Sequence, residues 1–152
     1  MAKRPSKKAT SATATSPKAS SEASKVEAAN LAYYKALSAR DMRAMEKVWS
    51  CAADNILVAP PVKPVTHVGW AAIKRNWEAY WPLFDKFNVS MKVTTVNING
   101  PAAWVHCIET SHRRKKKGEE SSSSNYGTNI FAYQDGRGLM VFHQSAVIRE
   151  KS

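Results

Sequence analysis

Apolar residues in the first half of the chain recur at spacings of three and four, as on one face of a helix. Residues 26–40 place Val26, Ala29, Tyr33 and Leu37 together in this way, which predicts an amphipathic helix. A second, shorter helix is expected over residues 42–49.

Asp41 stands at the N-cap position of this second helix, where a carboxylate accepts hydrogen bonds from the first free amides. Met42, Met45 and Trp49 form its apolar stripe. A strand is expected at residues 55–60, followed by a proline-punctuated loop that Gly69 closes.

A third helix is expected over residues 70–84. Its apolar face carries Ile73, Trp77 and Tyr80, and Pro82 should kink or end it.

The second half of the chain alternates between apolar and other residues with the period of a strand. Four strands are expected, at residues 87–98, 102–110, 126–134 and 139–148. The dipeptide Asn99-Gly100 and the tetrapeptide at 135–138 supply two of the turns. Three helices followed by four long strands predict an α+β fold with a largely antiparallel sheet.

Two of these strands are apolar on both faces. At 103–108, Val105 and Cys107 lie on one face while Trp104 and Ile108 lie on the other, and 139–148 is similar. A sheet with one solvated face should alternate cleanly. The helices can cover one face, and a second copy of the chain is the simplest cover for the other, so a homodimer is expected.

Composition separates the first 25 residues from the rest. They contain six Lys or Arg against one Glu and no aromatic residue, so they cannot bury enough apolar surface to offset their ordering entropy. Residues 1–25 are therefore expected to be a disordered basic tail, and 26–149 to be the folded domain.

A second basic segment, residues 113–117, lies inside the charged and serine-rich stretch 112–125. We expect 112–125 to be a solvated loop joining two strands of a hairpin. It has no interleaved aromatic residues to stack on bases and no nucleic-acid-binding motif, so specific nucleic-acid binding is not expected.

The two cysteines, Cys51 and Cys107, lie in apolar runs without metal-ligand spacing. Buried free thiols are expected, which favours a cytoplasmic protein. A Ser/Ala/Lys-rich N-terminal segment leaves organelle targeting as the alternative. No stretch approaches the ~20 apolar residues of a membrane span, and neither a metal site nor a cofactor is expected.

Four segments together, in their order and spacing, resemble the SnoaL-like branch of the NTF2-like superfamily. These are "AANLAYYKALSARDMRAMEKVW", "VGWAAIKRNW", "AAWVHCIE" and "TNIFAYQDGRGLMVFHQSA". The resemblance covers residues 26–148. It implies a cone, in which a strongly curved sheet wraps around helices and encloses a cavity, with dimers formed through the outer sheet face.

This chain departs from the family pattern at two places. Where the family often carries His-Pro after its first strand and His-His in its last, this chain has Ala59-Pro60 and His143-Gln144. Two imidazoles suited to proton transfer near neutral pH are therefore missing, which weakens the expectation of catalysis.

The cone topology implied by the resemblance places Glu109, Asn129 and His143 on adjacent strands. They could meet in the cavity, with Glu109 as a base, His143 as an acid or donor and Asn129 as an orienting amide. Alternatively, they form a structural polar cluster that satisfies itself. His106, three residues from Glu109, should face the other side of the sheet. The expected ligand-pocket residues are Trp49, Val58, Trp77, Asn129 and Phe131.

Three functions remain open from the sequence. The first is a dimeric protein that binds a small apolar or aromatic molecule, with uncertain catalytic activity. The second is an isomerase or hydrolyase that uses Glu109 and His143 as an acid–base pair. The third is a non-enzymatic interaction module with a basic tail.

Overall fold

The chain folds as three helices against one mixed sheet. The computed structural model describes residues 17–52, 54–58 and 65–149. In chain order the elements are α1 (Pro17–Ala39), α2 (Met42–Val48), β1 (Ile56–Val58), β2 (Thr66–Val68), α3 (Trp70–Tyr80), a 3-10 turn η1 (Trp81–Leu83), β3 (Phe84–Asn99), β4 (Ala102–Lys115), β5 (Glu120–Gln134) and β6 (Arg137–Val147). The expected α+β cone fold is confirmed.

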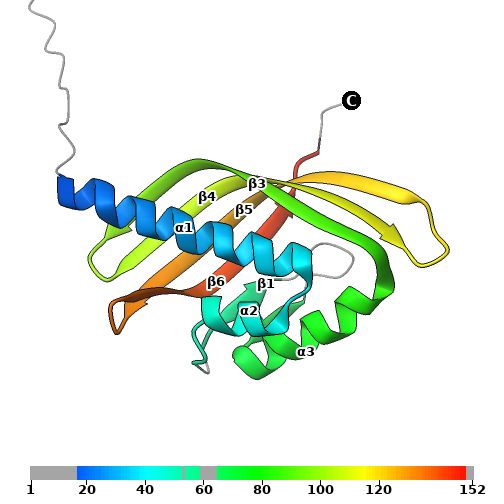
Figure 1. Cartoon of the computed structure of the whole chain (residues 1–152), viewed down its shortest axis with the longest axis horizontal. Helices are drawn as coiled ribbons and strands as arrows, with labels where there is room; N and C mark the ends of the chain where they lie inside the picture. Colours follow the sequence, from blue (N-terminus) through cyan, green and yellow to red (C-terminus); the bar gives the residue numbers. More distant parts are fainter. Residues whose placement is uncertain (1–16, 53, 59–64, 150–152) are drawn as a thin grey trace, which may run out of the picture.

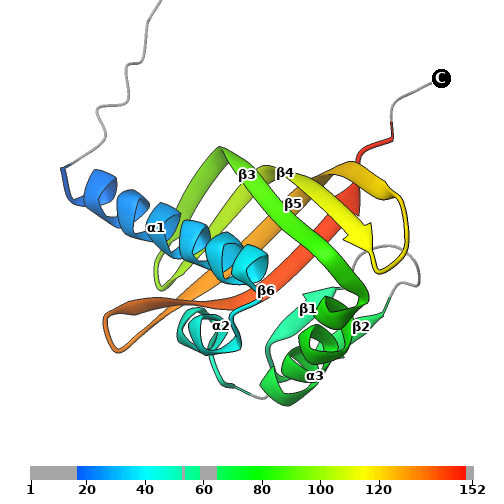
Figure 2. The ribbon, with the colours of Figure 1, turned by 45° about the vertical axis from the view of Figure 1, so that its right-hand side comes forward.

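The sheet has the strand order β2-β1-β6-β5-β4-β3. Strands β3 to β6 form an antiparallel meander, and the short strand β1 pairs in parallel with β6. Figure 1 shows α1 crossing one face of this sheet, and Figure 2 shows the long strands curving around it. Helix α1 packs mainly against β3 and also reaches β4 and β6.

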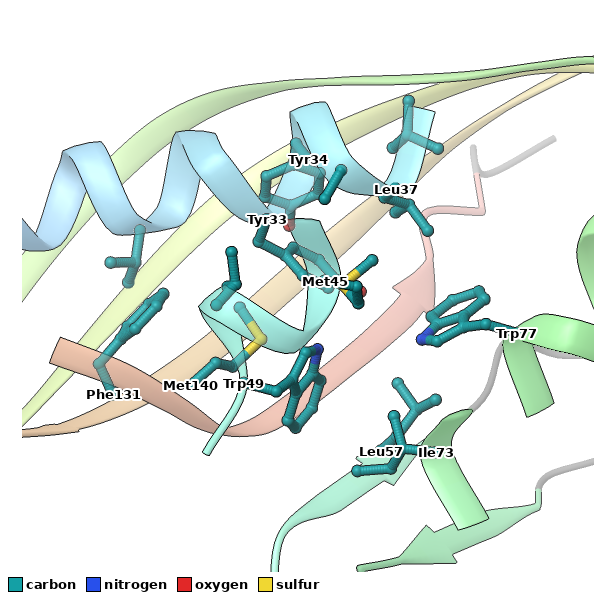
Figure 3. Close-up of a cluster of buried hydrophobic side chains, with 14 of the residues drawn as sticks. Tyr33, Tyr34, Leu37, Met45, Trp49, Leu57, Ile73, Trp77, Phe131 and Met140 are labelled. Atoms are coloured by element: carbon teal, nitrogen blue, oxygen red, sulfur yellow. The ribbon is translucent and has the colours of Figure 1, made fainter. Parts of the chain in front are cut away.

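The helices carry the stripes that the sequence predicts. Asp41 caps α2 by accepting a hydrogen bond from the Ala44 amide at 3.0 Å. Ile73 and Trp77 are the buried residues of α3, and the proline-containing turn η1 follows it directly. Figure 3 shows how Tyr33, Met45 and other large side chains from the helices and strands converge on one core.

The first helix begins earlier than the sequence predicts. It starts at Pro17, so residues 17–25 are helical rather than part of a tail. A helix nucleated by its packed segment propagates at little cost through Ala, Ser, Glu and Lys. Residues 1–16 of the expected tail and the Ala59-Pro60 pair lie outside the described residues.

The basic and serine-rich stretch 112–125 is not a loop. Most of it belongs to β4 and β5, whose pairing continues through His112↔Ser122 and Arg113↔Ser121. Only residues 116–119 lie between the two strands. The ladder hydrogen bonds continue the hairpin past its apolar part, because polar side chains are tolerated where strand faces meet solvent.

The two cysteines differ in exposure. Cys107 is buried as expected, whereas Cys51 is exposed, because it follows α2 where the chain leaves the core. No helix within the described ranges combines the length and hydropathy needed to cross a membrane.

The outer face of the sheet carries exposed apolar side chains. Trp104 on β4 is 38% exposed, and Tyr126 on β5 is 47% exposed. Ile108, Ile130 and Phe142 share this face and are half-buried. His106 also lies there, with its ring 5.5 Å from that of Tyr126.

Candidate functional site

A buried polar cluster joins α1 to the three central strands. Its members are Asn30 and Tyr34 from α1, Glu109 from β4, Asn129 from β5 and His143 from β6, and all five are buried. The structure therefore brings together the three strand residues that the sequence singled out. It adds two helix residues that the sequence analysis did not single out as site residues.

The donor and acceptor of each hydrogen bond in this cluster can be assigned. The Asn129 amide nitrogen donates to Asn30 Oδ1 at 2.6 Å and to the Tyr34 hydroxyl at 3.1 Å. The single hydroxyl proton of Tyr34 goes to Glu109 Oε1 at 2.6 Å. With both amide protons of Asn129 used, its Oδ1 is an acceptor, and it lies 2.5 Å from His143 Nδ1.

The acceptor role of Asn129 Oδ1 determines the tautomer of His143. Because Asn129 Oδ1 accepts, the neutral ring carries its proton on Nδ1 and leaves Nε2 bare. Nε2 lies 3.9 Å from Glu109 Oε1. Burial lowers the pKa of His143, and the Glu109 carboxylate opposes this effect. The ring is therefore neutral at neutral pH.

Glu109 is held by donors on both of its oxygens. Tyr34 donates to Oε1, and the Ser145 hydroxyl donates to Oε2. Burial raises the pKa of Tyr34 far above its ordinary value, with the Glu109 carboxylate adding to the effect. The phenol therefore stays protonated and remains a donor. Glu109 and His143 Nε2 together present two proton acceptors at the same place.

Gly127 makes room for the contact between Tyr34 and Glu109. A Cβ at this position would lie 2.7 Å from Glu109 Oε1 and 2.9 Å from the Tyr34 hydroxyl oxygen. Any side chain here would push the two groups apart. The glycine is thus part of the site, although it contributes no polar group.

A partly enclosed cavity of about 90 Å³ adjoins the cluster. Its polar lining includes Glu109, His143 and Ser145 at one end and Arg113 on the hairpin. Its apolar wall includes Leu37 from α1, Trp77 and Tyr80 from α3, and Phe87 and Val89 from β3.

The structure places the expected pocket residues in two groups. Trp77, Glu109 and His143 line the cavity. Trp49 and Phe131 do not, because both are core residues (Figure 3).

Asn129 does not line the cavity either, because it is fully buried and its amide is used within the cluster. Val58 neighbours the buried Leu57, so strand alternation turns it to the other face, where it pairs with Gln144. Of the five expected pocket residues, only Trp77 lines this cavity.

Sequence reasoning missed other residues of this region. Tyr34 is one of them, because its hydroxyl has a partner 75 positions away that periodicity does not reveal. Arg113 was assigned to a loop. Ser145 and Asn125 could have been predicted, because each lies two residues along its strand from another inward-facing residue and therefore shares its face.

Within the described ranges, no cluster of three or more His, Cys, Asp or Glu side chains has the arrangement of a metal site. The polar groups of the residues that line the cavity are carboxylate, hydroxyl, amide, imidazole, indole and guanidinium groups.

Comparison with known proteins gives the family of the chain. The model of the SnoaL-like domain matches residues 26–150. A search of curated proteins found no match.

Solved structures share the fold at low sequence identity. A proposed dehydratase of the NTF2-like family from Streptomyces avermitilis has 17% identity and a TM-score of 0.75, over 86% of this chain and 99% of that protein. An NTF2-like superfamily protein from Salmonella enterica has 12% identity and a TM-score of 0.78, over 88% and 95%. A ketosteroid isomerase-like protein from Erwinia carotovora atroseptica has 17% identity and a TM-score of 0.75, over 85% and 98%.

At these identities the structural likeness shows the fold alone, and the match to the family model is what assigns the sequence. The curved sheet, the helices on its inner face and a family match over nearly the whole described domain agree: the chain belongs to the SnoaL-like domain family.

Proposed function

We propose that the chain binds a small molecule in the cavity between α1, α3 and the inner face of the sheet. One observation carries the proposal. The cavity has an apolar wall around Trp77 and ends on two buried acceptors, Glu109 and His143, 3.9 Å apart. Apolar walls with a few convergent polar groups are typical of small-molecule sites.

Native mass spectrometry of the protein purified from its own cells tests this proposal. The expected result is a retained small molecule that is lost from a Glu109→Gln variant, because Gln keeps the shape but not the charge. Glu78→Gln is the matched control, since Glu78 is exposed on α3. A wild-type spectrum with only the mass of the chain would count against ligand binding.

Stability separates this role from a structural one. If Glu109 only satisfies Tyr34 and Ser145, the Gln variant should lose ~1–3 kcal/mol of unfolding free energy, the usual cost of a buried group left without its partner. Ligand retention would then be unchanged. If Glu109 serves the ligand, retention should fall while stability holds or rises.

The second candidate is an isomerase or hydrolyase that uses the same residues. The geometry favours it, because the Glu109 carboxylate can accept a proton from a substrate carbon while the bare His143 Nε2 accepts a hydrogen bond from the substrate. Burial lowers the pKa of His143, so the neutral ring predominates and is also a weak base. We therefore reassign it from acid to hydrogen-bond acceptor.

Proton exchange in D2O tests this second candidate without a known substrate. A panel of small ketones and keto acids would be followed by proton NMR for loss of the signals next to the carbonyl. Exchange catalysed by the wild type and by Glu78→Gln, but not by Glu109→Gln, is expected. Equal exchange with Glu109→Gln would contradict the assignment of the base.

The outer sheet face supports a homodimer. Trp104 and Tyr126 are exposed there beside three half-buried apolar residues, and burying apolar surface stabilises by ~25 cal/mol per Å². Analytical ultracentrifugation should give about twice the 16.8 kDa chain mass. Tyr126→Glu should dissociate the dimer, whereas Leu83→Glu, at an exposed site on η1, should not. A monomeric wild type would refute the proposal.

The cytoplasmic compartment expected from the cysteine usage stays a prediction.

A further inference from the structure

Arg113 is a cation without a counter-ion at the hairpin end of the cavity. Its two terminal nitrogens donate to neutral oxygens, the Tyr80 hydroxyl at 3.0 Å and Ser123 Oγ at 3.1 Å. Within the described part of the chain, no carboxylate pairs with it. Its neighbour Arg114, in contrast, lies 3.7 Å from Asp85 and 3.8 Å from Glu120.

Three of the five N–H donors of Arg113 make no hydrogen bond within the described residues, and the one on Nε is buried. Its Nε has no hydrogen-bond partner among the described residues. A partly buried charge without an opposite charge is costly, and an anion in the cavity would offset that cost. The planar guanidinium presents paired N–H groups that match the two oxygens of a carboxylate.

Two other cavity residues also hold buried atoms without partners. These are Trp77 Nε1, a donor, and Asn125 Oδ1, an acceptor on a side chain that is only 7% exposed. Buried polar atoms normally find partners. These three atoms are too buried to touch a ligand in the cavity, so what favours a ligand is the charge of Arg113, which lines the cavity.

The charges of the lining give the cavity two different ends. Arg113 and Glu109 lie four residues apart on β4, so their Cα atoms are separated by ~13 Å along the strand. The guanidinium end favours an anion. The other end, with Glu109 and the bare His143 Nε2, favours a donor such as a hydroxyl, an amine or an acidic C–H group.

We propose that the ligand is a small monocarboxylate, whose carboxylate binds Arg113 and whose apolar part lies against Trp77 and Tyr80. This inference rests on the proposed small-molecule site and names the class of its ligand. A cavity of about 90 Å³ favours a small ligand. Any longer part must extend through the opening of the cavity.

Binding of paired probes tests the proposal on the full chain. Butyrate and benzoate would be compared with butyramide and benzamide, which have the same shape without the charge, and with inorganic phosphate. Isothermal titration would measure affinity, and the Trp77 indole resonance, assigned with Trp77→Phe, would report whether a probe enters the cavity.

The carboxylates are expected to bind the wild type about tenfold or more tightly than the amides, as hydrogen bonds to a charged group allow. Arg113→Gln should abolish this preference, and Arg113→Lys should keep part of it. Arg114→Gln is the matched control, because it removes the same charge one residue away, and it should change affinity less than about twofold.

A structural role for Arg113 would give a different result. Tyr80→Phe removes the hydroxyl that Arg113 holds but leaves the guanidinium in place. Carboxylate binding that survives Tyr80→Phe supports the proposal. Loss of binding in Tyr80→Phe to the same extent as in Arg113→Gln would show that Arg113 acts as an anchor for α3, and the proposal would fall.

The remaining outcomes separate this inference from the proposed function. Amides or phosphate that bind as well as the carboxylates, with a shifted Trp77 resonance, would overturn the ligand class and leave the small-molecule site standing. Failure of every probe to bind would also overturn the monocarboxylate assignment. Native mass spectrometry would then decide separately whether any ligand is retained.

Discussion

The close approach of β5 to the Tyr34–Glu109 pair predicts that Gly127→Ala damages the site from within. The added methyl would meet Glu109 Oε1 at 2.7 Å, Glu109 Cδ at 2.9 Å and the Tyr34 hydroxyl at 2.9 Å. Such distances are shorter than carbon makes with these atoms, so at least one group must move. The 2.6 Å hydrogen bond between Tyr34 and Glu109 is the contact that this movement strains.

The size of the effect follows from two opposing contributions. Overpacking a buried site costs ~1–3 kcal/mol, while replacing Gly by Ala stabilises by ~0.4–1 kcal/mol through the unfolded chain. Gly138→Ala is the matched control, because a Cβ there meets nothing within 4 Å and Gly138 also lies in a strand of the same sheet. We expect Gly127→Ala to be the less stable variant by roughly 2 kcal/mol.

Urea unfolding of both variants measures this difference, with an unchanged m-value as the check that only stability has changed. In a Tyr34→Phe background the cost of Gly127→Ala should shrink, because one of the crowded oxygens is gone. If Gly127→Ala and Gly138→Ala are equally stable, the glycine is not required by the site. The packing of Tyr34 against Glu109 would then have to be looser than described.

Two further predictions concern ionisable groups. The pKa of His143 is lowered by burial, so the unfolded chain takes up a proton that the folded ring resists. Stability should therefore fall as pH drops below about 6.5, by up to ~1.4 kcal/mol per pH unit from this residue. His143→Gln should flatten that slope in pH-dependent urea unfolding, and equal slopes in both proteins would contradict it. For the cysteines, burial raises the pKa of Cys107 to about 11, whereas Cys51 is exposed. A thiol reagent should modify one thiol in the native wild type and none in Cys51→Ser, and a second fast-reacting thiol would show that Cys107 is accessible.

The sequence predicted the fold well because its elements follow from local patterns. The α2 cap at Asp41, the buried face of α3 and the turn at Gly100, with its φ of +58°, all depend on residues within a few positions of each other. The two-sided apolar pattern of β4 also predicted an exposed patch, and Trp104 is on it. These features can be predicted from sequence because each depends on backbone geometry and on residues close to it in the chain.

The extent of the elements was harder to predict, because it depends on partners distant in sequence. Among the described strands, β2 pairs with β1 alone, and its three residues gave no alternating pattern of their own. Residues 112–115 are polar and charged, yet they remain in β4 because β3 and β5 flank them and complete their backbone hydrogen bonds. Composition alone therefore assigned a paired strand to a loop.

The candidate site was also predictable in part: the sequence indicated which strand residues meet, but not how they are hydrogen-bonded. Strand order brought Glu109, Asn129 and His143 together, so topology was enough to predict their meeting. Which protons they share was not predictable, because it depends on Tyr34 and Asn30, which α1 places over the sheet.

The misplacement of Arg113 has a direct physical cause. On the alternating inner face of β4, it continues the row that runs through Glu109 and Ser111. Once the ladder is known to continue past residue 111, alternation sends the Arg113 side chain inward, toward the cavity, and the Arg114 side chain to the acidic groups of the surface. The basic run thus contains residues with different surroundings. A charged side chain that faces inward from the end of a hairpin, without an acidic partner, is better explained by an anion that the cavity receives than by solvation of the hairpin tip.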